Sequence, residues 1–315
     1  MTMIQDQLTF TTPDLTDLSD LVGNTPLLPL RRVTRSLPRR VQVLIKAEWF
    51  NPAGSVKDRP ALNIIRTALA NGNLPPGKRL LDSTSGNMGI AYATFCASLG
   101  IPITLTLPAN ASPERISILR ALGAELLLTD PLEGSDGAIR LARQLASEYP
   151  DRFWYANQYD NPANWQAHYQ TTGPEIFAQT GGQVTHFVAG VGTSGTLMGV
   201  GRYLRQVKPE IQIIQVQPNE AFHGLEGLKH MPTALVPAIF DVTFANCTIS
   251  VETEAAYEMV RRLAREEGLF VGISSGAAAW VALQLARELE EGVVVTVFPD
   301  AGYKYLSDKA LWEAQ

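Results

Sequence analysis

One lysine stands at a chemically suggestive place, inside residues 51–59 with the sequence NPAGSVKDR. The apolar run at residues 41–45 predicts a strand before this segment, and a helix is expected to begin near Arg59. Lys57 then lies at a helix start, where the positive end of the helix dipole disfavours an ammonium. A buried, neutral lysine amine is a nucleophile that forms Schiff bases with carbonyl groups. A solvated lysine paired with Asp58 is the simpler alternative, so other motifs must decide.

A second candidate is the glycine-rich loop GVGTSGT at residues 190–196, between an expected strand and an expected helix. Glycines let the backbone approach a ligand, and the free amides of a helix start bind anions, so the loop predicts a phosphate site. Gly190, Gly192 and Gly195 also satisfy G-x-G-x-x-G, which raises a dinucleotide alternative. The next strand ends without the acidic residue that a dinucleotide site needs. The three hydroxyl side chains of the loop suit a terminal phosphate monoester better.

The loop STSGN at residues 83–87 has the same setting and predicts a second anion site, sized for a carboxylate. An ordinary helix cap by Ser85 or Asn87 is the alternative. The Asn87 amide can also donate to a phenolic oxygen on a cofactor ring. A lysine, a phosphate site and a carboxylate site, all at strand–helix junctions, point to pyridoxal phosphate and an amino-acid substrate.

These sites must be positioned by an alternation of short apolar runs and amphipathic segments. Strands are expected at residues 41–45, 79–82, 101–107, 124–128, 184–189, 211–216 and 293–298. Helices are expected from about residue 59 and at residues 87–99, 112–122, 136–147, 165–179, 197–207, 253–267 and 276–290. Strands separated by helices predict parallel sheets with helices on both faces. Two clusters of this pattern predict two α/β domains, with ligand chemistry in the cleft between them.

The composition excludes several other classes of protein. The chain has 315 residues, 45% hydrophobic and 18% charged, with a net charge of −5, which gives no sign of nucleic-acid binding. Two distant cysteines and four histidines fit no ligand spacing, so no metal site is expected. Neither a signal peptide nor a membrane-spanning run is present, and a soluble, cytoplasmic protein is expected.

Six motifs together resemble cysteine synthase (O-acetylserine sulfhydrylase), which belongs to the fold-type II pyridoxal-phosphate enzymes. They lie at residues 51–59, 84–87, 157–159, 192–196, 272–276 and 305–307, within a resemblance that runs from about residue 21 to residue 307. The resemblance implies two three-layer α/β/α domains with mainly parallel sheets, as in the tryptophan synthase β subunit. Residues 48–158 would form a smaller, mobile domain that binds the substrate carboxylate. Residues 15–47 and 159–307 would form a larger domain that binds the cofactor phosphate, and the protein would be a homodimer.

The resemblance also implies a role for each matching residue. Lys57 would bind the cofactor as a Schiff base and then carry the substrate's α-proton. Asn87 would donate to the cofactor's 3′-oxygen, and Ser274 would face its ring nitrogen. The cofactor phosphate would be held by Gly192, Thr193, Ser194, Gly195 and Thr196. The substrate carboxylate would be bound by Thr84, Ser85, Gly86, Asn87 and Gln158.

Ser274 indicates the type of reaction. A serine hydroxyl cannot stabilise a full pyridinium charge as an aspartate would, so the ring is a weaker electron sink. This favours expulsion of a β-substituent over transamination. A capping serine for the following helix is compatible with the same position.

Two positions depart from the usual cysteine synthase pattern. Met88 stands where many members have threonine, beside the expected substrate site. Lys229 lies in a cationic segment that is more similar to B-type enzymes and to O-phosphoserine-using ones. A cation there would pair with a phosphate leaving group, with thiosulfate or with the carboxylate end of a sulfur-carrier protein. A solvent-facing loop lysine is an equally good interpretation.

The sequence therefore predicts a B-type cysteine synthase, which replaces the acetate of O-acetyl-L-serine or the phosphate of O-phospho-L-serine by a sulfur donor. Sulfide, thiosulfate and a sulfur-carrier protein are the candidate donors. Cystathionine β-synthase or another β-replacing synthase remains an alternative within the same fold. An NAD-dependent oxidoreductase using residues 190–195 and a non-catalytic ligand-binding protein are alternatives from other classes.

Overall fold

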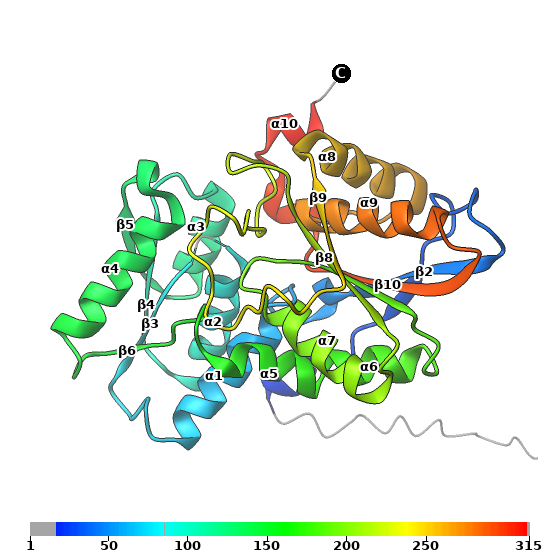
Figure 1. Cartoon of the computed structure of the whole chain (residues 1–315). Helices are drawn as coiled ribbons and strands as arrows, with labels where there is room; N and C mark the ends of the chain where they lie inside the picture. The colour runs from blue at the N-terminus through cyan, green and yellow to red at the C-terminus, as the bar shows by residue number, and fades with distance from the viewer. Residues whose placement is uncertain (1–16, 85, 314–315) are drawn as a thin grey trace, which may run out of the picture.

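Two β-sheets with helices on both faces organise the protein, as Figure 1 shows. The computed structural model describes residues 17–84 and 86–313. One sheet has the strand order β1-β2-β10-β7-β8-β9, and the other has the order β5-β4-β3-β6. All pairs of neighbouring strands are parallel except β1 and β2. The predicted α/β architecture with mainly parallel sheets is confirmed.

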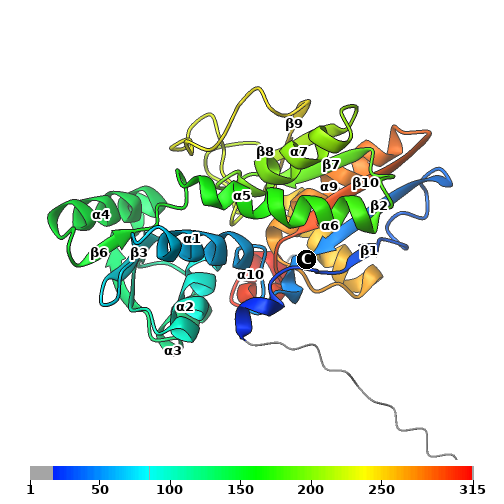
Figure 2. The same ribbon diagram turned by 90° about the horizontal axis from the view of Figure 1, so that it is seen from below.

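The six-stranded sheet combines two strands from the N-terminal part of the chain with four strands from its second half. They are β1 (Leu27–Pro29), β2 (Arg40–Ala47), β7 (His186–Gly190), β8 (Gln212–Pro218), β9 (Cys247–Val251) and β10 (Glu291–Phe298). Helices α8 (Thr253–Arg262) and α9 (Ile273–Arg287) cover one face, and α6 (Thr172–Gln179) and α7 (Gly195–Val207) cover the other (Figures 1 and 2). The short α10 (Lys309–Trp312) packs against α8.

The four-stranded sheet is built from one continuous part of the chain. Its strands are β3 (Arg79–Ser83), β4 (Ile103–Pro108), β5 (Glu125–Thr129) and β6 (Phe153–Tyr155). Its helices are α1 (Asp58–Ala70), α2 (Asn87–Leu99), α3 (Pro113–Ala121) and α4 (Gly134–Glu148), and α5 (Pro162–Gln170) runs between α1 and α7. Short helical turns are η1 (Leu18–Leu21), η2 (Glu48–Phe50), η3 (Pro131–Glu133), η4 (Leu263–Glu267) and η5 (Gly302–Tyr305).

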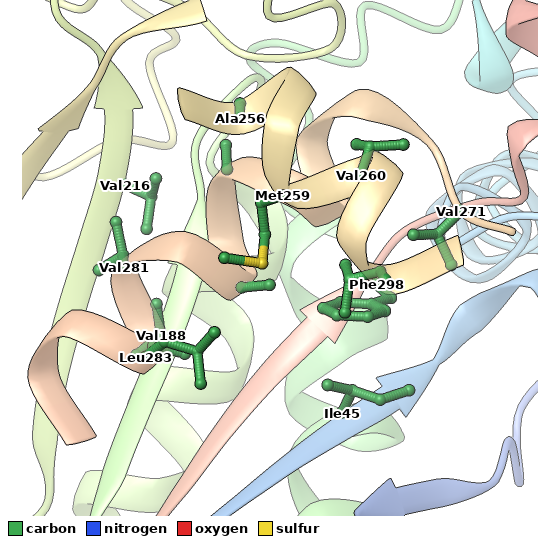
Figure 3. Packing of buried hydrophobic residues seen from close by; sticks show 14 of the residues in the cluster. Ile45, Val188, Val216, Ala256, Met259, Val260, Val271, Val281, Leu283 and Phe298 are labelled. Carbon is green, nitrogen blue, oxygen red and sulfur yellow. The ribbon is translucent and has the colours of Figure 1, made fainter. Parts of the chain in front are cut away.

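Side-chain alternation along the central strands explains why both faces of the larger sheet are covered. On β10, Val294 and Phe298 enter the core beneath α8 and α9. Figure 3 shows Phe298 in this core from close by. Val295 and Val297 point the other way, into the core beneath α6 and α7. A parallel strand that is apolar on both faces must be buried on both, so the apolar run at residues 293–298 requires helices on each side.

Three features of the fold differ from the sequence-based expectation. The helix predicted at residues 165–179 is two helices, α5 and α6, which meet at Thr171 with φ −126°. Pro174 lacks the N–H that a continuous helix would need there, so the break follows from the sequence itself. The helix predicted at residues 253–267 ends its α-helical part at Arg262 and finishes as the π-helical turn η4. The strands β1 and β6 escaped prediction because three residues are too few to show a period. Strand β9 was missed because it is a mostly exposed edge strand without an apolar run.

The catalytically interesting loops lie at the carboxyl ends of parallel strands. Residues 190–196 follow β7, residues 299–305 follow β10, and residues 84–87 follow β3. This is the side on which open α/β sheets bind ligands. Among the described residues, no helix has the length and apolar character needed to cross a membrane.

Candidate active site

Lys57 is the last residue before α1, as the sequence predicts. Its backbone N–H donates to Ser55 Oγ at 3.2 Å, and its carbonyl accepts from Ala61 N at 3.0 Å. The loop is fastened to the end of β10, because Val56 N donates to Pro299 O at 2.8 Å. The lysine is therefore held at the carboxyl edge of the larger sheet.

The surroundings of Lys57 favour its neutral amine. Removal from water lowers the pKa of Lys57; the charge of Asp300 opposes this shift, and the charge of Lys304 adds to it. A lowered pKa makes the unprotonated, nucleophilic form more abundant at neutral pH. Burial, and not the helix start that the sequence suggested, is the largest cause seen here.

A buried ionic cluster anchors the start of α1 behind Lys57. The guanidinium of Arg59 pairs with Glu48 at 2.8 Å and with Glu175 at 2.6 Å, and Lys46 pairs with Glu175 at 2.7 Å. Arg59 is 2% exposed and Glu48 is fully buried. Ion pairs of this kind fix a loop geometrically, since each charge is costly to leave without its partner.

The loop after β7 has the geometry of an anion cradle. A Cβ atom at Gly192 would lie 2.3 Å from the carbonyl oxygen of Gly227, so only glycine allows this close approach. Ser194 adopts a left-handed conformation with φ +69°, which turns the chain into α7. The first N–H groups of α7 have no helical acceptor and face the loop.

The hydroxyl groups of this loop fit a phosphate. Ser194 Oγ is buried and has no hydrogen-bond partner among the described residues. Thr193 Oγ1 is already positioned, because it accepts from Asn164 Nδ2 at 3.1 Å. Thr196 Oγ1 lies 3.4 Å from His168 Nε2, and burial lowers the pKa of that histidine well below its usual value. A buried donor without a partner beside the first amides of a helix is what a phosphate monoester would satisfy.

The loop after β3 meets the same cavity from the smaller sheet. Thr84 Oγ1 accepts from Gly89 N at 3.1 Å and from Gly86 N at 3.3 Å, so it caps α2. Gln158 is 3% exposed, and its Nε2 donates to Ser83 O at 2.7 Å. Ser85, predicted to bind the substrate carboxylate, lies outside the described residues.

One continuous hollow joins these parts. A cavity of about 490 Å³ is lined by Lys57, Thr84, Gly86, Asn87, Met88, Gln158 and Lys229. It continues into a space lined by Lys57, Asn87, Gly192, Thr193, Ser194, Gly195, Thr196 and Ser274. Volumes of about 300 to 1,000 Å³ are typical of small-molecule sites. All predicted site residues that the structure describes thus lie around one cavity.

Lys229 faces this cavity. Its Nζ lies 5.0 Å from the centre of the Tyr159 ring, a cation–π distance, and its backbone N–H donates to Val191 O at 2.8 Å. Burial lowers the pKa of Lys229, while the charge of Asp136 acts in the opposite direction. Lys229 is thus half-buried against the cavity and is not a fully solvent-facing loop lysine, and its role in binding a substrate stays a prediction.

Arg115 is a cavity residue that the sequence analysis missed. It is 6% exposed in the first turn of α3, forms an ion pair with Glu226 and lies 5.0 Å from the centre of the Tyr305 ring. Arg115 and Glu226 both line the substrate cavity, from opposite sides of the cleft. A cation in the first turn opposes the helix dipole, so its occurrence after Ser112-Pro113 could have signalled a nearby anion.

No group of three or more His, Cys, Asp or Glu side chains is arranged to hold a metal ion within residues 17–84 and 86–313. Both cysteines are free thiols, with Cys96 buried in α2 and Cys247 exposed. Burial raises the pKa of the Cys96 thiol to about 12, which fits a small apolar core residue.

Comparison with known proteins gives consistent likenesses. A family model described as pyridoxal-phosphate dependent enzyme matches residues 18–300. The chain is 55% identical over 292 residues to a cysteine synthase of Aquifex aeolicus, covering 91% of this chain and 89% of that protein. It is 44% identical to cysteine synthase B of Pseudomonas aeruginosa, covering 92% and 95%. The crystal structure of a cysteine synthase from Entamoeba histolytica superposes with a TM-score of 0.91 at 35% identity, covering 98% of this chain and 95% of that one.

Proposed function

The chain belongs to the family of pyridoxal-phosphate dependent enzymes, and from this premise we propose that it is a B-type cysteine synthase. It would form L-cysteine by replacing the acetate of O-acetyl-L-serine or the phosphate of O-phospho-L-serine. The observation that carries this proposal is the single cavity shared by the Lys57 amine, the anion cradle and the loop after β3. Because the family binds pyridoxal phosphate, we interpret residues 190–195 as its phosphate site and not as a dinucleotide site.

Each part of the cavity has a place in cofactor binding. Lys57 Nζ would attach the cofactor, and the amides and hydroxyls of residues 192–196 would hold its phosphate. Asn87 would donate to the 3′-oxygen of the ring, and Ser274 would face the ring nitrogen from the first turn of α9. When bound, pyridoxal phosphate withdraws electrons from the α-carbon of an amino acid.

The protein's own side chains would then transfer the substrate's α-proton and bind the substrate's α-carboxylate. The lowered pKa of Lys57 suits its Nζ for accepting the substrate's α-proton and returning it later. Thr84, Gly86, Asn87 and Gln158 would orient the α-carboxylate at the start of α2, where the helix dipole favours an anion. Closure of the cleft would keep water away from the reacting carbon.

The first test is whether the purified protein carries the cofactor on Lys57. We expect absorption in the visible range, cysteine formation from O-acetylserine and sulfide, and loss of turnover in Lys57→Ala. The exposed Lys309→Ala is the matched control and should behave as wild type. A colourless protein that cannot be reconstituted with pyridoxal phosphate would refute the proposal.

We further infer that Lys229 distinguishes the leaving groups. A cation in the cavity would stabilise a departing phosphate more than a departing acetate. Steady-state rates with O-phosphoserine and O-acetylserine test this in wild type and Lys229→Ala. If the ratio of the two rates is the same in both proteins, Lys229 has no such role. Parallel assays with sulfide and thiosulfate would show which donor is used.

The two sheets support the predicted division into a smaller domain at residues 48–158 and a larger one formed by residues 15–47 and 159–307. All four strands of the smaller sheet fall inside the first range, and all six of the larger sheet fall outside it. A homodimer and a cytoplasmic location remain predictions from the resemblance to the family. Sedimentation analysis of the purified protein would test the dimer.

A further inference from the structure

The side-chain amide of Asn87 is held at both ends by charged residues from the segment after β10. Lys304 Nζ donates to Asn87 Oδ1 at 2.7 Å, and Asn87 Nδ2 donates to Asp300 Oδ2 at 2.7 Å. Asn87 begins α2 on the smaller sheet, whereas both charged residues follow the central strand β10 of the larger sheet. The contacts therefore cross the cleft beside the cavity.

This arrangement permits only one orientation of the amide. A half-turn of the Asn87 side chain would place its NH₂ group against the Lys304 ammonium and its oxygen against the Asp300 carboxylate. The first contact would then place two donors face to face, and the second would place two acceptors face to face. In the observed orientation one N–H of Nδ2 is used by Asp300, and the second remains for a ligand in the cavity that Asn87 lines.

The two charged residues are themselves fixed. Lys304 Nζ also donates to Gly54 O at 3.2 Å, in the loop that carries Lys57. Asp300 is fully buried, and its Oδ2 accepts from Tyr305 Oη at 2.9 Å. Neither Lys304 nor Asp300 lines the cavity, so they act on a ligand through residues that do, and Asn87 is the cavity residue that both of them contact.

We propose that Lys304 is a positioning residue, which orients the Asn87 amide so that its free N–H points at the 3′-oxygen of the cofactor. This inference rests on the proposed function, in which Asn87 makes that contact. Because Lys304 also binds Gly54, one ammonium aligns the amide donor and the lysine-bearing loop. Without this ammonium the affinity for the cofactor would fall and the surroundings of its ring would change, although Lys304 does not touch the cofactor.

Lys304→Met tests the proposal, with Lys304→Arg to restore a donor and the exposed Lys309→Met as the matched control. Each apoprotein is titrated with pyridoxal phosphate, and the visible spectrum gives both the dissociation constant and the absorption maximum. A hydrogen bond to a charged group changes an equilibrium by about tenfold or more. We expect Lys304→Met to weaken cofactor binding by about that factor and to shift the absorption maximum. Lys304→Arg should recover most of both, and Lys309→Met should match wild type.

A double-mutant cycle separates positioning from general stabilisation. In an Asn87→Ala background, Lys304→Met should weaken cofactor binding much less than it does in wild type, because the amide that it positions is absent and only its contact with Gly54 is lost. An equal effect in both backgrounds would overturn the proposal, as would a wild-type affinity and spectrum in Lys304→Met. If Lys304→Met does not fold, Lys304→Gln provides the same measurements. A wild-type protein that binds no pyridoxal phosphate would instead refute the proposed function, and this inference with it.

Discussion

Removal of Arg59 should destabilise the protein far more than removal of an ordinary surface arginine. The guanidinium of Arg59 is 1% exposed and pairs with Glu48, whose side chain is fully buried. In Arg59→Met, Glu48 keeps its charge in a place that water does not reach. Burial is the largest influence and would raise the pKa of Glu48, but the charge and hydrogen bonds of Arg59, together with Thr25 and Lys46, hold that pKa below its usual value, so this carboxylate depends on its partner.

The magnitude follows from the burial of the stranded partner. Breaking a buried ion pair by removing one member costs about 3–5 kcal/mol. Total stabilities of about 5–15 kcal/mol are usual, so this loss would be a large fraction of the whole. The pair between Arg40 and Glu291 is the internal comparison, because its side chains are 81% and 73% exposed. Its removal should cost about 0–1 kcal/mol.

Urea unfolding followed by circular dichroism measures both effects. We expect Arg59→Met to lower the free energy of unfolding by about 3–5 kcal/mol, and Arg40→Met to leave it nearly unchanged. Adding Glu48→Gln to Arg59→Met should recover part of the loss, because it removes the unpaired charge. The loss should also shrink at lower pH, where Glu48 can be protonated.

Equal small losses in Arg59→Met and Arg40→Met would refute this reasoning. Such a result would mean that water or a rearranged side chain satisfies Glu48 without Arg59. A failure of Glu48→Gln to recover any stability would show that lost packing of the Arg59 side chain, and not the stranded charge, dominates the cost.

Three further outcomes are expected. Gly192→Ala should abolish retention of pyridoxal phosphate on dialysis, since its Cβ would lie 2.3 Å from a backbone oxygen; retention by the variant would contradict the cradle. Arg115→Met should raise the KM for the anionic substrate severalfold and leave the visible spectrum unchanged, because Arg115 lines only the substrate part of the cavity; an unchanged KM would exclude that role. Burial raises the pKa of Asp58 from 3.8 to about 7, so the folded state binds this proton more tightly than the unfolded state. The stability that Asp58 contributes is present below about pH 4 and is lost as the pH rises to about 7. Asp58→Asn should flatten this part of the stability profile, measured by urea unfolding from pH 4 to 8, and an unchanged slope would assign it to other groups.

The local sequence was sufficient to predict the strand–helix junctions on which the candidate site residues stand. Lys57 does stand at a helix start and residues 190–196 do turn from a strand into a helix, because such features depend on a few neighbouring residues. The loop at residues 84–87 likewise joins β3 to α2. Pro174 carried a signal for the break between α5 and α6, although the apolar pattern concealed it.

Contacts between distant segments decided the rest. Lys304 meets Asn87 across 217 positions, and Arg59 meets Glu175 across 116. No periodicity or cap predicts such pairs, because the parallel sheets determine which loops share an edge. The cavity that unites Lys57 with Arg115 and Lys229 exists only once the two sheets face each other. The sequence by itself determined which residues were the first candidates for the chemistry and on which kind of junction they stand. The tertiary structure decided which charges surround them, because burial and through-space distance set the pKa of Lys57 and the orientation of the Asn87 amide.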